Sequence, residues 1–114
     1  MKYLTLLFVL FVLAGCASTP YLYYGDSSYR YYQSVKHPND LNQTYYKVSL
    51  EHVFDKSARL GIKVPPGLYC DYALLMLRRG DALAAREYLL KEKDTWTESA
   101  SLVDFLLAKH GLRN

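Results

Sequence analysis

The chain has 114 residues and a formal net charge of +3, and 51% of its residues are hydrophobic. That length suits one small domain with a modest core. The positive charge is small and forms no long basic run, so the composition does not predict binding to nucleic acid or another polyanion.

The first 16 residues have the pattern of an export signal. Lys2 supplies a positive start, and Tyr3 to Leu13 are apolar apart from Thr5. This run is shorter than the about 20 apolar residues that a transmembrane helix needs. It ends in Leu13-Ala14-Gly15-Cys16, which resembles the lipobox of bacterial lipoproteins, in which the cysteine receives the lipid.

The signal divides the chain into three parts. We predict a cleaved signal peptide over residues 1–15, a lipidated tether over 16–20 and a helical domain over 21–114. An Asp directly after the lipidated cysteine commonly retains a lipoprotein in the inner membrane. In this chain the residues after Cys16 are Ala17 and Ser18 instead. We therefore expect lipid anchoring in the cell envelope, at the outer membrane and facing the periplasm.

Tyrosines crowd the segment after the tether. Eight of the twelve lie between Tyr21 and Tyr46. A tyrosine has a large apolar ring and a polar tip, which suits interfaces and sugar-binding surfaces, although some rings must fill the core. We predict partner contacts for five of them, in competition with contacts to the membrane interface: Tyr21, Tyr23, Tyr24, Tyr31 and Tyr32.

The rest of the pattern is helical, and we expect an all-α domain of about four to five helices. The predicted helices cover residues 28–35, 40–60, 67–79, 81–94 and 95–110. Asp26 or Ser27 is expected to cap the first, Asn39 or Asp40 the second, and Pro66 to open the third. Thr95 or Thr97 is expected to cap the last, where Thr95-x-x-Glu98 fits a capping box. Gly61 and Gly80 are expected to end their helices. Cys70 is expected to be a buried free thiol, since a lipidated Cys16 leaves it no partner in the chain.

The apolar positions predict which side of each helix is buried. In the second helix the stripe comprises Leu41, Tyr45, Val48, Val53 and Phe54, with Leu50 interrupting it; in the last it comprises Leu102, Phe105 and Leu106. Acidic residues interleave with Arg86, Lys91 and Lys93, which predicts a solvated face: Asp81, Glu87, Glu92, Asp94 and Glu98. His37, His52 and His110 lack metal-ligand spacing, and no nucleophile or phosphate-binding motif is present, so we expect no cofactor and no enzymatic activity.

Residues 69–97 resemble one tetratricopeptide-type helical hairpin. Tyr69 takes the bulky first position, Ala73 and Ala85 the small positions, Gly80 the turn and Leu89 the large apolar position. Glu92 departs from this pattern, because a third small residue is usual there, and Thr97 stands where proline is common. The length of the chain excludes a long repeat array.

A second resemblance covers nearly all of the chain after the signal. Its motifs are Tyr23-Tyr24-Gly25, Val64-Pro65-Pro66-Gly67-Leu68-Tyr69, Gly80, Glu92 and Trp96-Thr97-Glu98-Ser99. In this order, and after a lipobox, they resemble the short bacterial lipoproteins catalogued as domain of unknown function 4810. The resemblance implies a complex with other envelope lipoproteins, including one similar to the curli secretion channel. It implies no catalytic residue.

Together these features predict a non-enzymatic envelope lipoprotein that acts as a protein-interaction module or assembly factor. The alternative is a binding module for cell-wall glycan or another small envelope ligand, through the tyrosine-rich surface.

Overall fold

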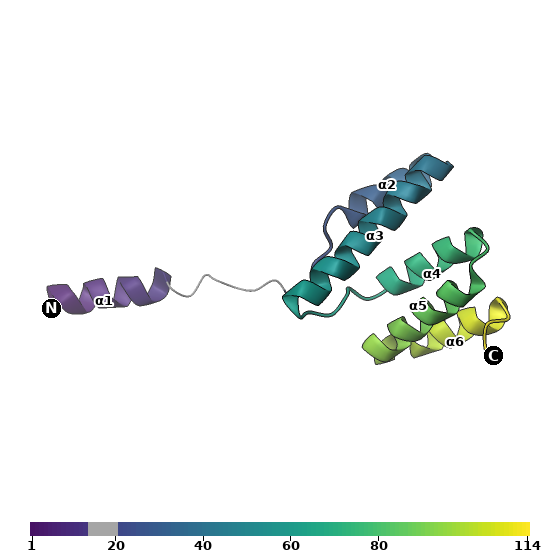
Figure 1. Ribbon diagram of the computed structural model, residues 1–114. Helices are drawn as coiled ribbons and strands as arrows, with labels where there is room; N and C mark the ends of the chain where they lie inside the picture. The colour runs from purple at the N-terminus through teal and green to yellow at the C-terminus, as the bar shows by residue number, and fades with distance from the viewer. Residues whose placement is uncertain (14–20) are drawn as a thin grey trace.

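The computed structural model describes residues 1–13 and 21–114, and within these ranges the regular structure is entirely helical (Figure 1). The helices are α1 (Lys2–Leu13), α2 (Ser27–Lys36), α3 (Asp40–Leu60), α4 (Leu68–Arg78), α5 (Ala82–Thr95) and α6 (Ala100–Lys109), and a short 3-10 turn, η2 (Thr97–Ser99), precedes α6. The predicted all-α domain is therefore confirmed, with helix ends within a few residues of those expected.

Helix α1 covers the apolar run of the predicted signal, and its side chains from Tyr3 to Val9 are exposed. Across residues 1–13 and 21–114, no helix has both the length and the apolar character needed to cross a membrane. Cys16 and the predicted tether lie outside the described residues.

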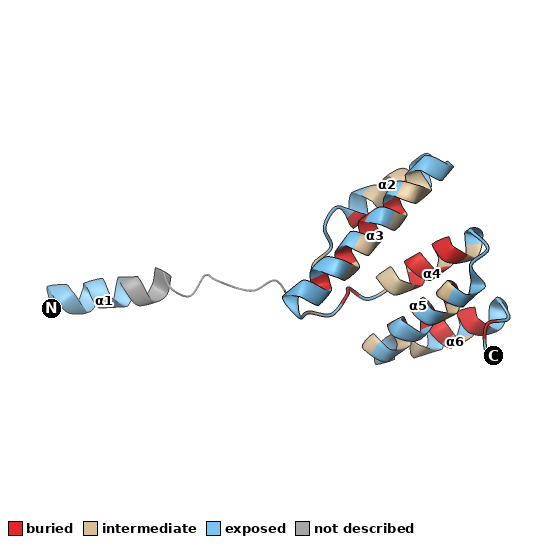
Figure 2. Cartoon of the chain, viewed as in Figure 1, coloured by how far each residue is buried: buried red, intermediate tan, exposed pale blue. Residues whose placement is uncertain are grey.

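The helical domain consists of two antiparallel hairpins and a closing helix (Figure 1). Helix α2 packs on α3, α4 packs closely on α5, and α6 lies against α5. One core cluster runs through α3, α4, α5 and α6, from Tyr46 and Leu50 on α3 to Leu107 and Leu112 at the C-terminal end. Figure 2 shows stretches of buried residues in red on these four helices.

The two hairpins are joined by side chains of α3 and α4. Tyr72 Oη donates to Glu51 Oε1 at 2.7 Å, and Arg79 Nη2 donates to Thr44 Oγ1 at 2.8 Å. Phe54 of α3 packs against Tyr72, with ring centroids 5.3 Å apart, in a cluster that also includes Tyr69 and Tyr88. The interface between the hairpins is thus part apolar and part hydrogen-bonded.

Several predicted helix ends are confirmed. Asn39 Oδ1 accepts from the Asn42 amide at 2.8 Å at the start of α3, and Asp81 Oδ1 accepts from the Ala84 amide at 3.0 Å at the start of α5. Gly61 and Gly80 have φ of +65° and +81°, the left-handed conformation that glycine adopts most readily after a helix.

Three predicted ends are wrong. Asp26 precedes α2 but does not cap it, because its carboxylate accepts from Ser49 of α3 and from Arg30. Pro66 does not open α4, which begins at Leu68 behind Gly67. Thr95 lies inside α5, where its hydroxyl donates to the Lys91 carbonyl at 2.7 Å, so no Thr95–Glu98 capping box forms. Thr97 does not cap the last helix either, because it begins η2 and α6 starts at Ala100.

The predicted stripes on α3 and α6 are confirmed only in part. On α3, Val53 is buried as expected, but Leu41, Tyr45 and Val48 are exposed, and Tyr46 and Leu50 are buried in their place. On α6, Leu106 is buried as expected, but Leu102 and Phe105 are exposed, and Val103 and Leu107 face the core. In both helices the neighbouring helices, rather than the apolar pattern alone, select the buried face.

The prediction of a solvated acidic face is wrong for Glu92, because the side chain of this residue is fully buried. Its Oε1 accepts from the Gly67 amide at 2.8 Å and from the Ser99 hydroxyl at 2.9 Å. Nearby, Trp96 Nε1 donates to the Val64 carbonyl at 2.8 Å. Through these hydrogen bonds, Glu92 and Trp96 hold the loop between the hairpins against the end of α5.

Cys70 is a buried free cysteine, as predicted. Burial, with the nearby carboxylates of Glu92 and Asp71, raises the pKa of the Cys70 thiol to about 12. The thiol therefore stays protonated at neutral pH and packs as a small apolar group of α4.

Candidate binding groove

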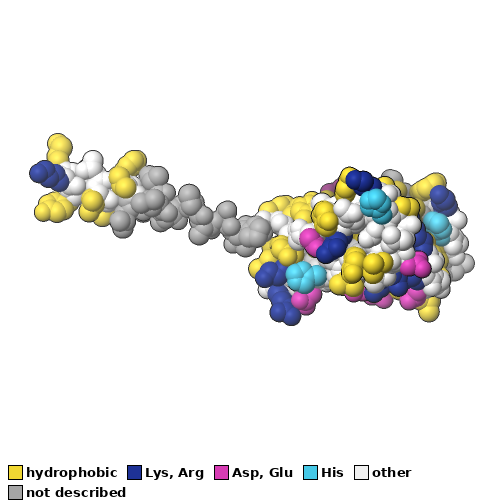
Figure 3. All heavy atoms as spheres, turned by 90° about the horizontal axis from the view of Figure 1, so that it is seen from above, with side chains coloured by type: hydrophobic (Ala, Val, Ile, Leu, Met, Phe, Trp, Pro, Cys, Tyr) yellow, Lys and Arg dark blue, Asp and Glu magenta, His cyan; other side chains and the backbone are white. Residues whose placement is uncertain are grey.

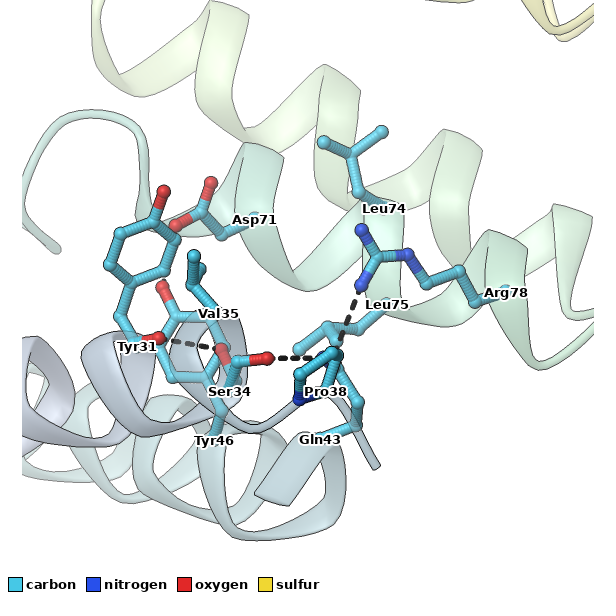
Figure 4. A pocket seen from close by; sticks show the side chains of 10 residues that line it. All are labelled: Tyr31, Ser34, Val35, Pro38, Gln43, Tyr46, Asp71, Leu74, Leu75 and Arg78. Atoms are coloured by element: carbon cyan, nitrogen blue, oxygen red, sulfur yellow. Dashed lines mark hydrogen bonds between the residues drawn. The ribbon is translucent and has the colours of Figure 1, made fainter. Parts of the chain in front are cut away.

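A groove runs between α2 and α4, with α3 beneath it. Its larger hollow has a volume of about 340 Å³ (Figure 4). Ten side chains line this hollow: Tyr31, Ser34, Val35, Pro38, Gln43, Tyr46, Asp71, Leu74, Leu75 and Arg78. They come from both hairpins, so the groove exists only when the hairpins are packed together.

Asp71 and two tyrosines form the centre of the groove. Tyr46 Oη donates to Asp71 Oδ2 at 2.5 Å, and the rings of Tyr31 and Tyr46 lie 5.6 Å apart at 59°. Burial raises the pKa of Asp71, although the hydrogen bond from Tyr46 opposes this. Burial and the neighbouring Asp71 carboxylate raise the pKa of Tyr46 above its usual value, so this phenol remains a donor at neutral pH.

A second, smaller hollow of about 190 Å³ continues the groove on the other side of this centre. It shares Tyr31, Tyr46 and Asp71 with the larger hollow and is completed by Tyr24, Ser27, Ser28 and Leu68. The carboxylate of Asp71 therefore borders both hollows.

The far end of the larger hollow carries positive charge. Arg78 Nη1 donates to Gln43 Oε1 at 3.1 Å, and Gln43 Nε2 donates to the Ser34 carbonyl at 3.3 Å, as Figure 4 shows. These bonds link α2, α3 and α4. The groove thus has a carboxylate at its centre and a guanidinium at one end, seven residues apart on α4.

The five predicted contact tyrosines fall in different places. Tyr24 and Tyr31 line the groove, whereas Tyr32 is exposed on α2 with the Lys36 ammonium 5.3 Å from its ring. Tyr21, the first residue after the predicted tether in the sequence, is exposed. Tyr23 is half-buried, with its ring 6.3 Å from that of His52, and lines a separate hollow on the α2–α3 hairpin.

Sequence reasoning missed Asp71, Gln43, Leu74 and Arg78 as groove residues. The sequence contains one indication of a role for Asp71, because it is the only acidic residue in the apolar helix α4. The others look like ordinary surface or core residues until α2 is placed against α4.

The surface outside the groove is mixed in character. Figure 3 shows hydrophobic side chains reaching the surface of the helical domain among charged ones. Among the residues that the structure describes, no cluster of His, Cys, Asp and Glu is arranged to hold a metal ion.

The fold and the groove define a small all-α domain of two helical hairpins and a closing helix, with a tyrosine-lined groove between the hairpins. The chain belongs to the family described as "Domain of unknown function (DUF4810)", whose model matches residues 21–106. The family that the second set of sequence motifs predicts is thereby confirmed. Neither a curated protein nor a solved structure matches the chain.

Proposed function

We propose that this chain is a non-enzymatic envelope lipoprotein, held at the outer membrane by lipid on Cys16. Its helical domain acts as a protein-interaction module or assembly factor, with other envelope lipoproteins as its partners. The observation that carries the proposal is the groove between α2 and α4, which presents aromatic, aliphatic and charged side chains together at an exposed surface.

The chemistry of the groove fits a segment of another protein. Tyr31, Val35 and Leu74 offer apolar area, while Asp71 and Arg78 supply charges at fixed positions. Protein interfaces favour aromatic residues and arginine, and a few fixed polar groups set their register. The residues that line the two hollows include Asp71 but no histidine and no other carboxylate, so they offer no carboxylate pair and no carboxylate–histidine pair for acid–base chemistry.

The variant Tyr31→Ala tests whether the partner binds in the groove. The matched control is Tyr32→Ala, at the neighbouring position on α2. The two tyrosines are equally exposed, at 52% and 53%, but only Tyr31 lines the groove. After mild crosslinking in cells, we expect wild type and Tyr32→Ala to recover the same protein partner. Tyr31→Ala should recover about tenfold less, the loss expected for an interface residue worth roughly 1.4 kcal/mol.

Equal recovery by both tyrosine variants would contradict the assignment of the groove. Recovery of no protein partner by wild type would contradict the proposed function itself. Binding of purified cell-wall glycan that is lost in Tyr31→Ala would instead support the glycan-binding alternative. Melting curves of both variants show whether either substitution unfolds the domain.

Cys16→Ser tests the anchor. Each buried methylene of an acyl chain contributes about 0.8 kcal/mol to membrane binding, so a multiply acylated chain stays on the membrane. Without the thiol no lipid is attached, and we expect mass spectrometry to find the acyl mass shift in wild type but not in Cys16→Ser. The absence of the shift in wild type, or the same shift in Cys16→Ser, would contradict lipidation at Cys16.

A further inference from the structure

We propose that the smaller hollow accepts the positively charged side chain of a lysine or arginine on the partner protein. This inference rests on the proposed function and identifies the chemistry that the groove recognises. The receiving group is Asp71, surrounded by Tyr24, Tyr31 and Tyr46; these four residues are called the Asp71 pocket below.

Asp71 is one of the carboxylates that have no ion pair among the residues that the structure describes. Five other carboxylates of the chain pair with a lysine or arginine within 4.0 Å: Asp26, Glu51, Asp55, Glu87 and Asp104. Within the described part of the chain, Asp71 has no such ion pair, although it is half-buried. Arg78 lies about two helical turns away on α4, where it donates to Gln43.

This arrangement leaves one side of Asp71 available to a ligand. Its Oδ2 accepts the hydrogen bond from Tyr46. Its carboxylate borders both hollows of the groove, where a partner side chain can approach it. Because a partly desolvated carboxylate is costly without a positive partner, a lysine or arginine inserted here gains a charge-assisted hydrogen bond.

The tyrosines of the Asp71 pocket suit the same ligand. The faces of aromatic rings attract ammonium and guanidinium groups. This chain already uses such contacts elsewhere, since Lys91 Nζ lies 4.4 Å from the ring centroid of Tyr88 and the Arg30 guanidinium lies 5.0 Å from that of Tyr45. Three tyrosines around one carboxylate therefore favour a cation over a neutral or anionic group.

The size of the smaller hollow suits one inserted side chain. Its volume of about 190 Å³ is below the range of about 300–1,000 Å³ that is usual for small-molecule sites. The adjoining hollow of about 340 Å³ offers Val35, Pro38 and Leu74 to the residues that flank the inserted side chain. A protein segment can occupy both hollows at once.

The test places a photoreactive p-benzoylphenylalanine at the pocket rim of the full chain in cells, as Ser28→p-benzoylphenylalanine. Ser28 lines the pocket and is exposed, so the probe leaves Asp71 and the tyrosines unchanged. After irradiation, we expect a crosslinked partner peptide with a lysine or arginine within about three residues of the attachment point, which is about 10 Å of extended chain.

Two further substitutions, made in the probe-bearing chain, test the contacts. Asp71→Asn keeps an acceptor for Tyr46 but removes the charge, and should lower the crosslink yield about tenfold. Tyr24→Leu should lower the yield severalfold, because it removes an aromatic face. The matched control is Asp94→Asn, an exposed carboxylate of α5 outside the groove, which should leave the yield unchanged.

The outcomes separate this inference from the proposed function. A crosslinked protein segment without basic residues, a yield unchanged in Asp71→Asn, or crosslinks to lipid alone would overturn the Asp71 pocket as a cation site. So would the absence of crosslinks from position 28 while the partner is still recovered in the Tyr31 experiment. Loss of the partner in both experiments would overturn the proposed function as well. If Asp71→Asn lowers the melting temperature, replacing the partner's basic residue by methionine should give the same tenfold loss.

Discussion

Glu92→Ala is expected to lower the free energy of unfolding by about 3 kcal/mol. The substitution removes the acceptor for the Gly67 amide and for the Ser99 hydroxyl, and it leaves a void where a fully buried side chain stood. The gain from removing Oε2, which is buried without a hydrogen-bond partner, offsets only part of this loss. Urea denaturation followed by circular dichroism measures the change, with Trp96 fluorescence reporting on the neighbouring loop contact.

The matched control for this variant is Glu87→Ala. Glu87 lies on the same helix but is exposed, and it pairs with Lys91 at 2.9 Å. An exposed ion pair of this kind contributes about 0–1 kcal/mol. Ser99→Ala should fall between the two, at about 1 kcal/mol, because it removes one of the two hydrogen bonds to Glu92. If Glu92→Ala cost no more than Glu87→Ala, the carboxylate would not hold the loop.

The burial of Glu92 could not be predicted from the sequence. Its neighbours in the sequence, Lys91, Lys93 and Asp94, are charged, which is the local pattern of a solvated face. Its actual partners are Gly67, 25 residues earlier, and Ser99, seven residues later. A departure from the tetratricopeptide pattern at this position was visible in the sequence, but the reason for it required the packed loop.

Helix ends that depend on local interactions, by contrast, were predictable. Asn39 and Asp81 cap their helices through bonds to residues three positions on, and Gly61 and Gly80 end helices through their own backbone conformation. Such interactions are local, so a short stretch of sequence contains both partners. The failure at Asp26 has the opposite cause, because Ser49 of α3 binds its carboxylate.

The groove was only partly predictable, because its residues come from helices that are distant in the sequence. The excess of tyrosine identified Tyr24 and Tyr31, since composition alone makes that segment unusual. Asp71 and Arg78 belong to the other hairpin, and nothing in the sequence places α4 beside α2. A site made by two hairpins depends on long-range packing, which periodicity within one helix does not reveal.

Leu50→Ala is expected to cost about 2–5 kcal/mol of unfolding free energy. The apolar pattern of α3 predicts Leu50 as an interruption of the stripe, yet its side chain is fully buried and belongs to the core cluster that joins α3 to the second hairpin. Truncation leaves a cavity at this junction. Val48→Ala is the matched control, because Val48 belonged to the predicted stripe but is 53% exposed, and a change of no more than about 0.5 kcal/mol is expected there.

The comparison tests the orientation of α3 directly. If the apolar stripe had been right, Val48→Ala would be the costly variant and Leu50→Ala the mild one, so chemical denaturation of both variants distinguishes the two orientations. The orientation also matters for binding, because rotating α3 by one residue would take Tyr46 away from Asp71 and dismantle the centre of the groove. Leu50→Ala should therefore weaken partner recovery in proportion to the unfolded fraction, while Val48→Ala should leave recovery unchanged, since Val48 lines neither hollow of the groove.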